Sequence, residues 1–96
     1  MPFKITYPPH VKAKLKQLTV DATGSGRAEQ FFQLLAEVEQ RLRDDALSLG
    51  EELYTLSDSG IQIRHAIVGF LVVYWGVHEE TAVVIVKDYR LFPAGA

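Results

Sequence analysis

The stretch Ile61–Val86, IQIRHAIVGFLVVYWGVHEETAVVIV, decides the fold of this 96-residue chain. Its first part, Ile61–Ile67, alternates isoleucine and histidine with Gln, Arg and Ala, which is the two-residue period of a half-buried strand. After a break at Gly69, the apolar run Phe70–Val77 favours a central strand covered on both faces. Thr81–Val86 is a third run, rich in β-branched residues. The connections are too short for parallel crossovers, so we predict an antiparallel three-stranded meander.

The chain before the meander is expected to supply an edge strand and two helices. Phe3–Tyr7 alternates and predicts a strand that ends at Pro8, because proline has no N–H for a ladder. Apolar residues recur at helical spacing through Pro9–Ala22, and a loop is expected at Asp21–Gly26 from its composition. A longer second helix is predicted over Arg27–Leu47. Its main apolar stripe consists of Phe31, Leu35, Val38 and Leu42.

This order predicts one α+β domain spanning residues 1–96, with both helices on one face of a four-stranded sheet. Glu51–Gly60 is expected to be a connector with a weak strand tendency at its start. The residues after Val86 are expected to form a frayed end with Pro93 as a breaker. The second face of the sheet would then be open, which is where a site or a partner surface can lie.

Composition excludes several classes of function. The net charge of −2 argues against a dedicated nucleic-acid binder, because such proteins carry a clear basic excess. The chain has no cysteine, so it has no disulfide and no thiolate chemistry, which fits a reducing compartment. The three histidines have no tight spacing, so we expect no metal site and no cofactor. No long apolar segment predicts a signal peptide or a membrane span, and we expect a cytoplasmic protein.

A family resemblance is carried by two segments, Leu49–Leu56 and Ile63–Val86. Both are similar to segments of the RelE/ParE toxin superfamily, and the similarity extends over nearly the whole chain. Leu49–Leu56, LGEELYTL, is similar to the family's glycine-containing connector after its second helix. Ile63–Val86 is similar to the family's basic strand, turn, apolar strand, acidic turn and last apolar strand. The closest matches are the dipeptide Val73-Tyr74 and the turn His78–Glu80. The resemblance implies a strand, a helical hairpin and a closing meander, as the periodicity does.

The resemblance also implies two activities. RelE-like members are ribosome-dependent endoribonucleases that cut messenger RNA with basic and aromatic side chains and no metal. ParE-like members inhibit DNA gyrase and lack those side chains. Members of both kinds are neutralised by an antitoxin protein that wraps the toxin surface. A cognate antitoxin is therefore the partner that the resemblance implies.

The endoribonuclease residues of the family are only partly present in this chain. The family's basic-x-basic pattern falls on Gln62 and Arg64, so one of the two positions is basic. Leu71 stands where the family often has an arginine. At the end of the chain the family often has a basic residue followed by Tyr or His, whereas here Tyr89 comes before Arg90. Cleavage by a 2′-oxygen needs an acid, a base and cations. The predicted residual catalytic site consists of Arg64, Lys87, Tyr89 and Arg90.

Among the histidines, His65 falls on the apolar face of its strand, and a hydrogen-bonded core histidine is the favoured interpretation. His78 lies in an acidic turn, and we expect it to be solvated there.

The open face is predicted to be a protein-binding surface. If Gln62 and Arg64 face the open side, strand pairing places Leu71, Val73 and Trp75 there as well. Exposed apolar groups of this kind mark an interface, and a tryptophan is a natural anchor for a partner. An equally weighted alternative is that the C-terminal segment 89–96 folds back and covers the patch.

Three hypotheses about function follow from the sequence. The first is a toxin-like component of a toxin–antitoxin pair that binds a partner protein and has weakened or lost its RNase chemistry. The second is an active ribosome-dependent endoribonuclease. The third is a structural or regulatory homodimer without a toxic role.

Overall fold

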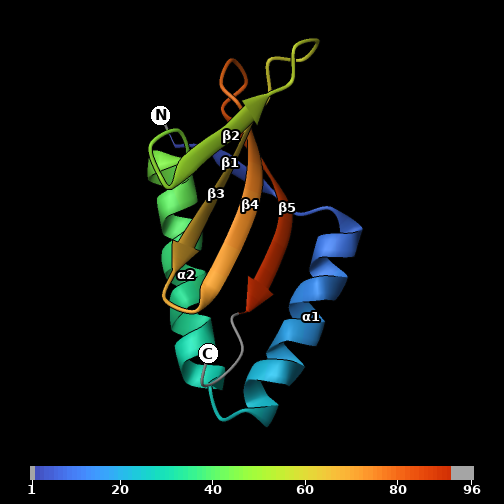
Figure 1. Cartoon of the computed structure of the whole chain (residues 1–96), viewed down its shortest axis with the longest axis vertical. Helices are drawn as coiled ribbons and strands as arrows, with labels where there is room; N and C mark the ends of the chain where they lie inside the picture. Colours follow the sequence, from blue (N-terminus) through green and yellow to red (C-terminus); the bar gives the residue numbers. More distant parts are fainter. Residues whose placement is uncertain (1, 92–96) are drawn as a thin grey trace.

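The computed structural model describes residues 2–91, which form two helices and five strands (Figure 1). In chain order these are β1 (Lys4–Thr6), α1 (Pro9–Gly24), α2 (Ala28–Asp45), β2 (Glu51–Thr55), β3 (Gln62–Val68), β4 (Leu71–His78) and β5 (Val83–Leu91). Residues 92–96 are not among the described residues. The expected breaker Pro93, and the expected folding-back of the C-terminal segment beyond Leu91, therefore lie outside them.

The strands form one mixed sheet with the order β1-β5-β4-β3-β2. The meander β3-β4-β5 is antiparallel as predicted, and β1 lies parallel to β5 at one edge. The α+β class is confirmed, but the predicted four-stranded sheet is wrong because β2 adds a fifth strand beyond β3. The connector had shown only a weak strand tendency. The local sequence of β2 is a weak strand former, and the main-chain hydrogen bonds with β3 stabilise the extended conformation.

Both helices pack on one side of the sheet, as predicted. Figure 1 shows α2 behind β3 and β4, while α1 lies beside β5. The helix α2 buries Phe31, Val38 and Leu42 completely. Between residues 2 and 91, no helix combines the length and the apolar character that crossing a membrane requires.

The helix α1 extends further than its sequence predicts. It begins at Pro9. Proline suits the first helical position because an N–H there would have no acceptor within the helix, so its absence costs no hydrogen bond. It continues through the expected loop to Gly24, and Ala22 in its last turn is fully buried. Packing of that turn therefore overrides the loop-like composition of the DATG segment.

The strand β5 is also longer than predicted and contains a bulge that positions the polar residues of the open face. The expected frayed end is wrong as far as Leu91, which pairs with β4. In the register, Trp75 pairs with Val86 whereas Tyr74 pairs with Asp88, so Lys87 is the extra residue. A bulge of this kind changes which side chains share a face. Val86 and Tyr89 are consequently both buried.

Candidate functional site

The three residues predicted to bind a partner lie in the core. The register pairs Arg64 with Trp75 and Ala66 with Val73, so the prediction that these positions share one face is confirmed. That face is the helix-covered one, however, and Leu71, Val73 and Trp75 are each fully buried. The indole Nε1 of Trp75 donates a hydrogen bond of 3.2 Å to the carbonyl oxygen of Ala46. The prediction that these three side chains line an open face is therefore wrong.

Arg64 lies on the same covered side, where its guanidinium binds the backbone of the segment that follows α2. Its Nε donates to the carbonyl oxygen of Leu49 at 3.1 Å, and its Nη2 donates to that of Gly50 at 3.2 Å. Its Nη1 donates to the Oε1 of Gln62 at 2.6 Å. Gly50 has a φ of +63°, and a side chain there would overlap the carbonyl group of His65. Arg64 is only 8% exposed, so it is not available to a phosphate group as the endoribonuclease hypothesis requires.

Tyr89, the predicted aromatic of the catalytic set, is fully buried on the helix side. Its hydroxyl lies 3.4 Å from that of Tyr7, which donates to Glu39 at 2.7 Å. Burial raises the pKa of Tyr89 to about 12. Burial, followed by the proximity of Tyr89, raises the pKa of Tyr7 well above its usual value. Neither phenol is suited to proton transfer near neutral pH, because the best catalytic pKa lies close to the operating pH.

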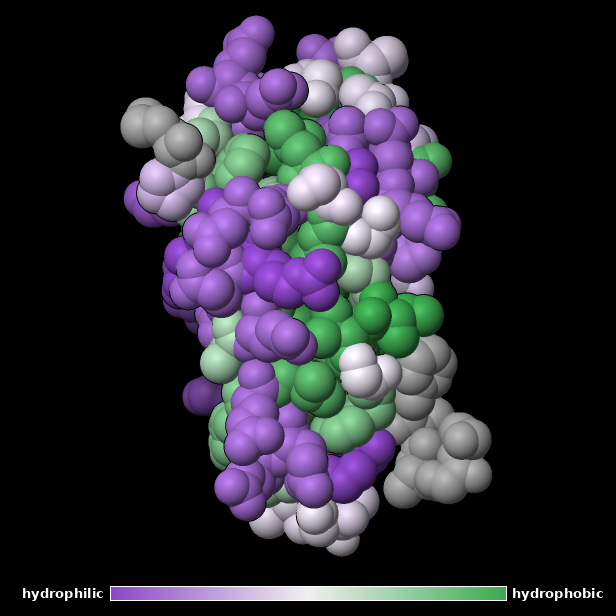
Figure 2. All heavy atoms as spheres, turned by 90° about the vertical axis from the view of Figure 1, so that its left-hand side faces the viewer, coloured by the Kyte–Doolittle hydropathy of each residue, from purple (hydrophilic) through white to green (hydrophobic). Residues whose placement is uncertain are grey.

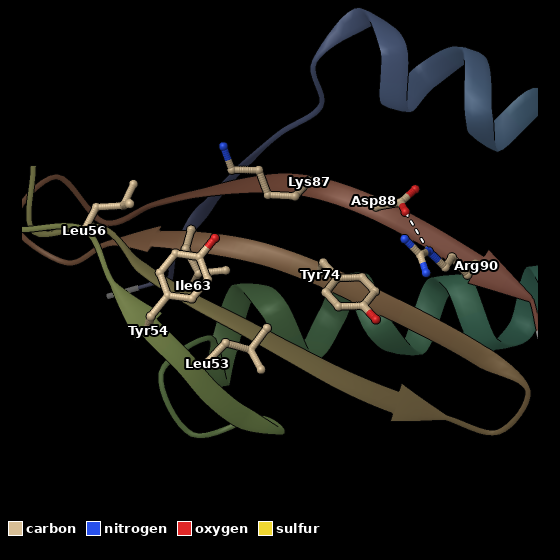
Figure 3. A pocket seen from close by; sticks show the side chains of 8 residues that line it. All are labelled: Leu53, Tyr54, Leu56, Ile63, Tyr74, Lys87, Asp88 and Arg90. Atoms are coloured by element: carbon tan, nitrogen blue, oxygen red, sulfur yellow. Dashed lines mark hydrogen bonds and ion pairs between the residues drawn. The ribbon is translucent and has the colours of Figure 1, made fainter.

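A hollow of about 470 Å³ lies on the open face of the sheet and is the candidate functional site (Figure 3). Its residues come from β2, β3, β4, β5 and the turn after β2. They are Leu53, Tyr54, Leu56, Ile63, Tyr74, Lys87, Asp88 and Arg90. The apolar side chains line the part of the hollow nearer β2, and the charged side chains lie along β5. This combination of apolar surface with a few polar groups is typical of a binding site.

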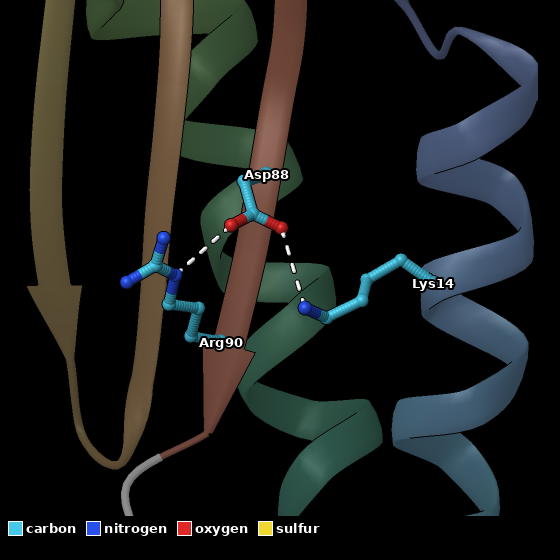
Figure 4. A network of polar contacts seen from close by, with 3 residues as sticks. All are labelled: Lys14, Asp88 and Arg90. Atoms are coloured by element: carbon cyan, nitrogen blue, oxygen red, sulfur yellow. Dashed lines mark hydrogen bonds and ion pairs between the residues drawn. The ribbon is translucent and has the colours of Figure 1, made fainter.

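The charged end of the hollow contains a small ion-pair network (Figure 4). Asp88 Oδ2 lies 3.0 Å from the Nε of Arg90, and Asp88 Oδ1 lies 3.6 Å from the Nζ of Lys14 on α1. The Arg90 guanidinium also lies over the ring of Tyr74, at 5.4 Å from its centroid. The hydrogen bond that Arg90 donates to Asp88 raises the pKa of Arg90, which stays protonated. Of the predicted catalytic residues, Lys87 and Arg90 both line the hollow on the open face, and Arg64 and Tyr89 do not.

His65 lies on the open face, where the sequence had suggested a core position. It pairs with Tyr74 across β3 and β4, and the two ring centroids are 5.8 Å apart. Its side chain is half-buried, and its buried Nδ1 has no hydrogen-bond partner within residues 2–91. The favoured interpretation as a hydrogen-bonded core histidine is therefore wrong. His78 is half-buried, and its Nδ1 lies 2.7 Å from the hydroxyl of Thr81 in the turn before β5.

Sequence reasoning missed the apolar surface that β2 and β3 expose. Leu53, Tyr54 and Ile67 are 46%, 55% and 58% exposed, and Leu56 next to them is 39% exposed. Figure 2, which views the molecule from the left-hand side of Figure 1, shows apolar surface between two hydrophilic regions. The segment LYTL was the available signal, because three large apolar residues follow a pair of glutamates in a presumed connector.

No metal site is found in the described part of the chain, which holds no cluster of three or more His, Asp or Glu residues placed to bind an ion. Comparison with protein families and comparison with curated proteins each gave no match. The relationship to the RelE/ParE superfamily therefore stays a prediction from the sequence pattern.

Proposed function

We propose that this chain is a toxin-like protein of the RelE/ParE kind that acts through protein contacts, with a partner segment bound in the hollow of the open sheet face. One observation supports this above the others. The hollow exposes leucine and tyrosine side chains of β2 next to two cations of β5. Exposed apolar groups with a polar border are characteristic of an interface.

The charges at the site indicate the chemistry of the partner. Asp88 is paired with two cations, Lys14 and Arg90, and Lys87 is a further cation that lines the hollow, in a chain whose net charge is −2. Complementary charges favour correct encounter and orientation of two proteins. The expected partner segment therefore presents apolar side chains to Leu53 and Tyr54 and a carboxylate to the β5 end. An antitoxin of this composition is the partner that we propose.

The hydrogen bonds of the covered face favour a protein-binding function over RNase catalysis. Arg64 uses its guanidinium on backbone carbonyl groups, and the Tyr89 phenol is buried against Tyr7. Two of the four predicted catalytic side chains are thus committed to the fold. Loss or weakening of RNase chemistry is what this arrangement favours.

The test is co-expression in bacteria with the protein encoded next to this chain. We expect growth arrest from the chain alone, relief by the neighbour, and a complex that can be purified. Lys87→Glu should weaken the complex about tenfold, because it places a negative charge against the partner's carboxylate.

Lys16→Glu is the matched control, since Lys16 is an exposed lysine on α1 outside the hollow. Equal affinities of the two variants for the neighbour would contradict the proposed site. Absence of both arrest and complex would contradict the proposed function.

An endoribonuclease is the second candidate, because Tyr54 and Tyr74 lie with Lys87 and Arg90 on the same face. Aromatic rings that stack on bases and cations that contact phosphates are what a single-stranded RNA site requires. Mapping RNA ends in arrested cells tests this candidate. New ends that disappear with Arg90→Ala but persist with Lys16→Ala would favour RNA cleavage over binding.

A further inference from the structure

The strand β2 lies at an edge of the sheet. It pairs with β3 on one side only, and all five of its residues are exposed. Monomeric proteins commonly place lysine or proline on such an edge, because its free N–H and C=O groups can pair with another chain. The sequence EELYT contains neither. Its one irregularity is the bulge at Leu53.

Exposed apolar side chains are concentrated at this edge. Within residues 2–91, six large apolar residues are exposed, and four of them lie on β2, on β3 or just after β2. These four are Leu53, Tyr54, Leu56 and Ile67. The strand order of the sheet places β2 at its border, separated from β4 and β5 by β3. An edge with both free backbone groups and apolar side chains is suited to pairing with another strand.

We propose that β2 pairs antiparallel with β2 of a second copy of this chain, around a two-fold axis at Leu53, to form one continuous sheet. The charges of the strand favour this partner. Both glutamates are at the first end, so an antiparallel pair places Glu51 opposite Thr55 and Glu52 opposite Tyr54. A parallel pair would place like charges side by side, which is destabilising. The strand is therefore complementary to itself, as an isologous interface requires.

This surface shares Leu53 and Tyr54 with the hollow of the proposed function, but it uses the main chain of β2 where the hollow uses their side chains. The dimer uses the outer edge of β2, whereas the partner segment uses the open face near β5. The dimer does not require a toxin–antitoxin pair, and each proposal can fail without the other.

The first experiment uses single cysteines, which the cysteine-free chain allows. In the proposed register, the Cα atoms of the two Leu53 residues lie about 4.5–5.5 Å apart, which is within the range of a disulfide. The two Glu51 residues are offset by four positions, or about 13 Å. We expect Leu53→Cys to form a covalent dimer under mild oxidation and Glu51→Cys to remain monomeric on a denaturing gel. Equal cross-linking of the two variants, or none by Leu53→Cys, would overturn the proposal.

The second experiment measures the oligomeric state of the wild-type chain by sedimentation equilibrium. We expect a dimer whose dissociation constant increases at least about tenfold with Leu53→Lys, because a lysine at the edge opposes strand pairing. Phe32→Lys is the matched control, since Phe32 is 52% exposed on α2. Circular dichroism checks that each variant is folded. A monomeric wild-type chain, or a dimer that Leu53→Lys leaves intact, would overturn the proposal.

Discussion

Two tyrosines on neighbouring strands show how the two faces of the sheet differ. Tyr89 on β5 faces the helices, is fully buried, and has its hydroxyl close to that of Tyr7. Tyr74 on β4 faces the open side, is half-buried, and lies under the guanidinium of Arg90 in the hollow. The same residue type is therefore structural on one face and available for binding on the other. Whether a tyrosine of the sheet is buried or available for binding therefore depends on whether α1 and α2 cover its face, and not on its residue type.

The largest expected effect is the loss of stability on truncating the covered face. Trp75→Ala should reduce the free energy of unfolding by about 3–5 kcal/mol, because it leaves a cavity and removes the hydrogen bond to Ala46. Ile67→Ala on the open face should change it by about 0.5 kcal/mol or less, since Ile67 is largely exposed. Urea denaturation followed by fluorescence or circular dichroism measures both values. Similar losses in the two variants would contradict the assignment of faces.

The second expected effect is loss of stability at alkaline pH. Burial raises the pKa of Tyr89 from 10.0 to about 12 in the folded chain. Between these two values the unfolded chain releases the proton that the folded chain retains, so stability falls as the pH rises. The loss attributable to Tyr89 should total about 2–3 kcal/mol, and none of it is expected below the unfolded pKa. Burial of Tyr7 acts in the same direction.

Denaturation curves recorded at successive pH values test this prediction. Tyr89→Phe should flatten the fall in stability between about pH 10 and 12, because phenylalanine has no proton to release. Tyr74→Phe, which removes the same hydroxyl from a half-buried tyrosine of the open face, is the matched control. A fall that persists in full with Tyr89→Phe would show that other groups cause it.

A smaller loss of stability is expected when a cation of the covered face is replaced, and almost none when a cation of the open face is replaced. Arg64→Met should cost about 2 kcal/mol, because it leaves the carbonyl groups of Leu49 and Gly50 without their donor. Lys87→Met should change stability by about 0.5 kcal/mol or less, since Lys87 is exposed on the open face. Thermal unfolding of the two variants measures the difference. If Lys87→Met were the more damaging, Lys87 would have a structural role that the contacts described above do not include.

The sequence predicted the arrangement of elements better than the orientation of β3. Periodicity located both helices and the meander, and it also predicted that Arg64 and Trp75 share a face. It assigned that face to the open side because the isoleucines of β3 looked like the buried set. In the structure, Ala66 and Val68 pack against the core and Arg64 reaches the carbonyl groups after α2. A reversal of this kind exchanges every side chain between the two faces.

The candidate site was only partly predictable for related reasons. Lys87 and Arg90 were identified from the sequence, but the bulge that precedes Arg90 and Asp88 on the open face depends on pairing between β4 and β5. The contribution of Leu53 and Tyr54 was missed because β2 is a strand only through its pairing with β3.

The sequence alone determined the α+β class, the order of the elements and the antiparallel connections of the meander. These follow from local periodicity, from short connections and from proline positions, which act within a few residues. The tertiary structure alone decided the fifth strand, the bulge and the choice of covered face. These depend on contacts between residues far apart in the chain, such as the hydrogen bond from Trp75 to Ala46. Packing of the helices on one side of the sheet therefore determined which residues the open face presents.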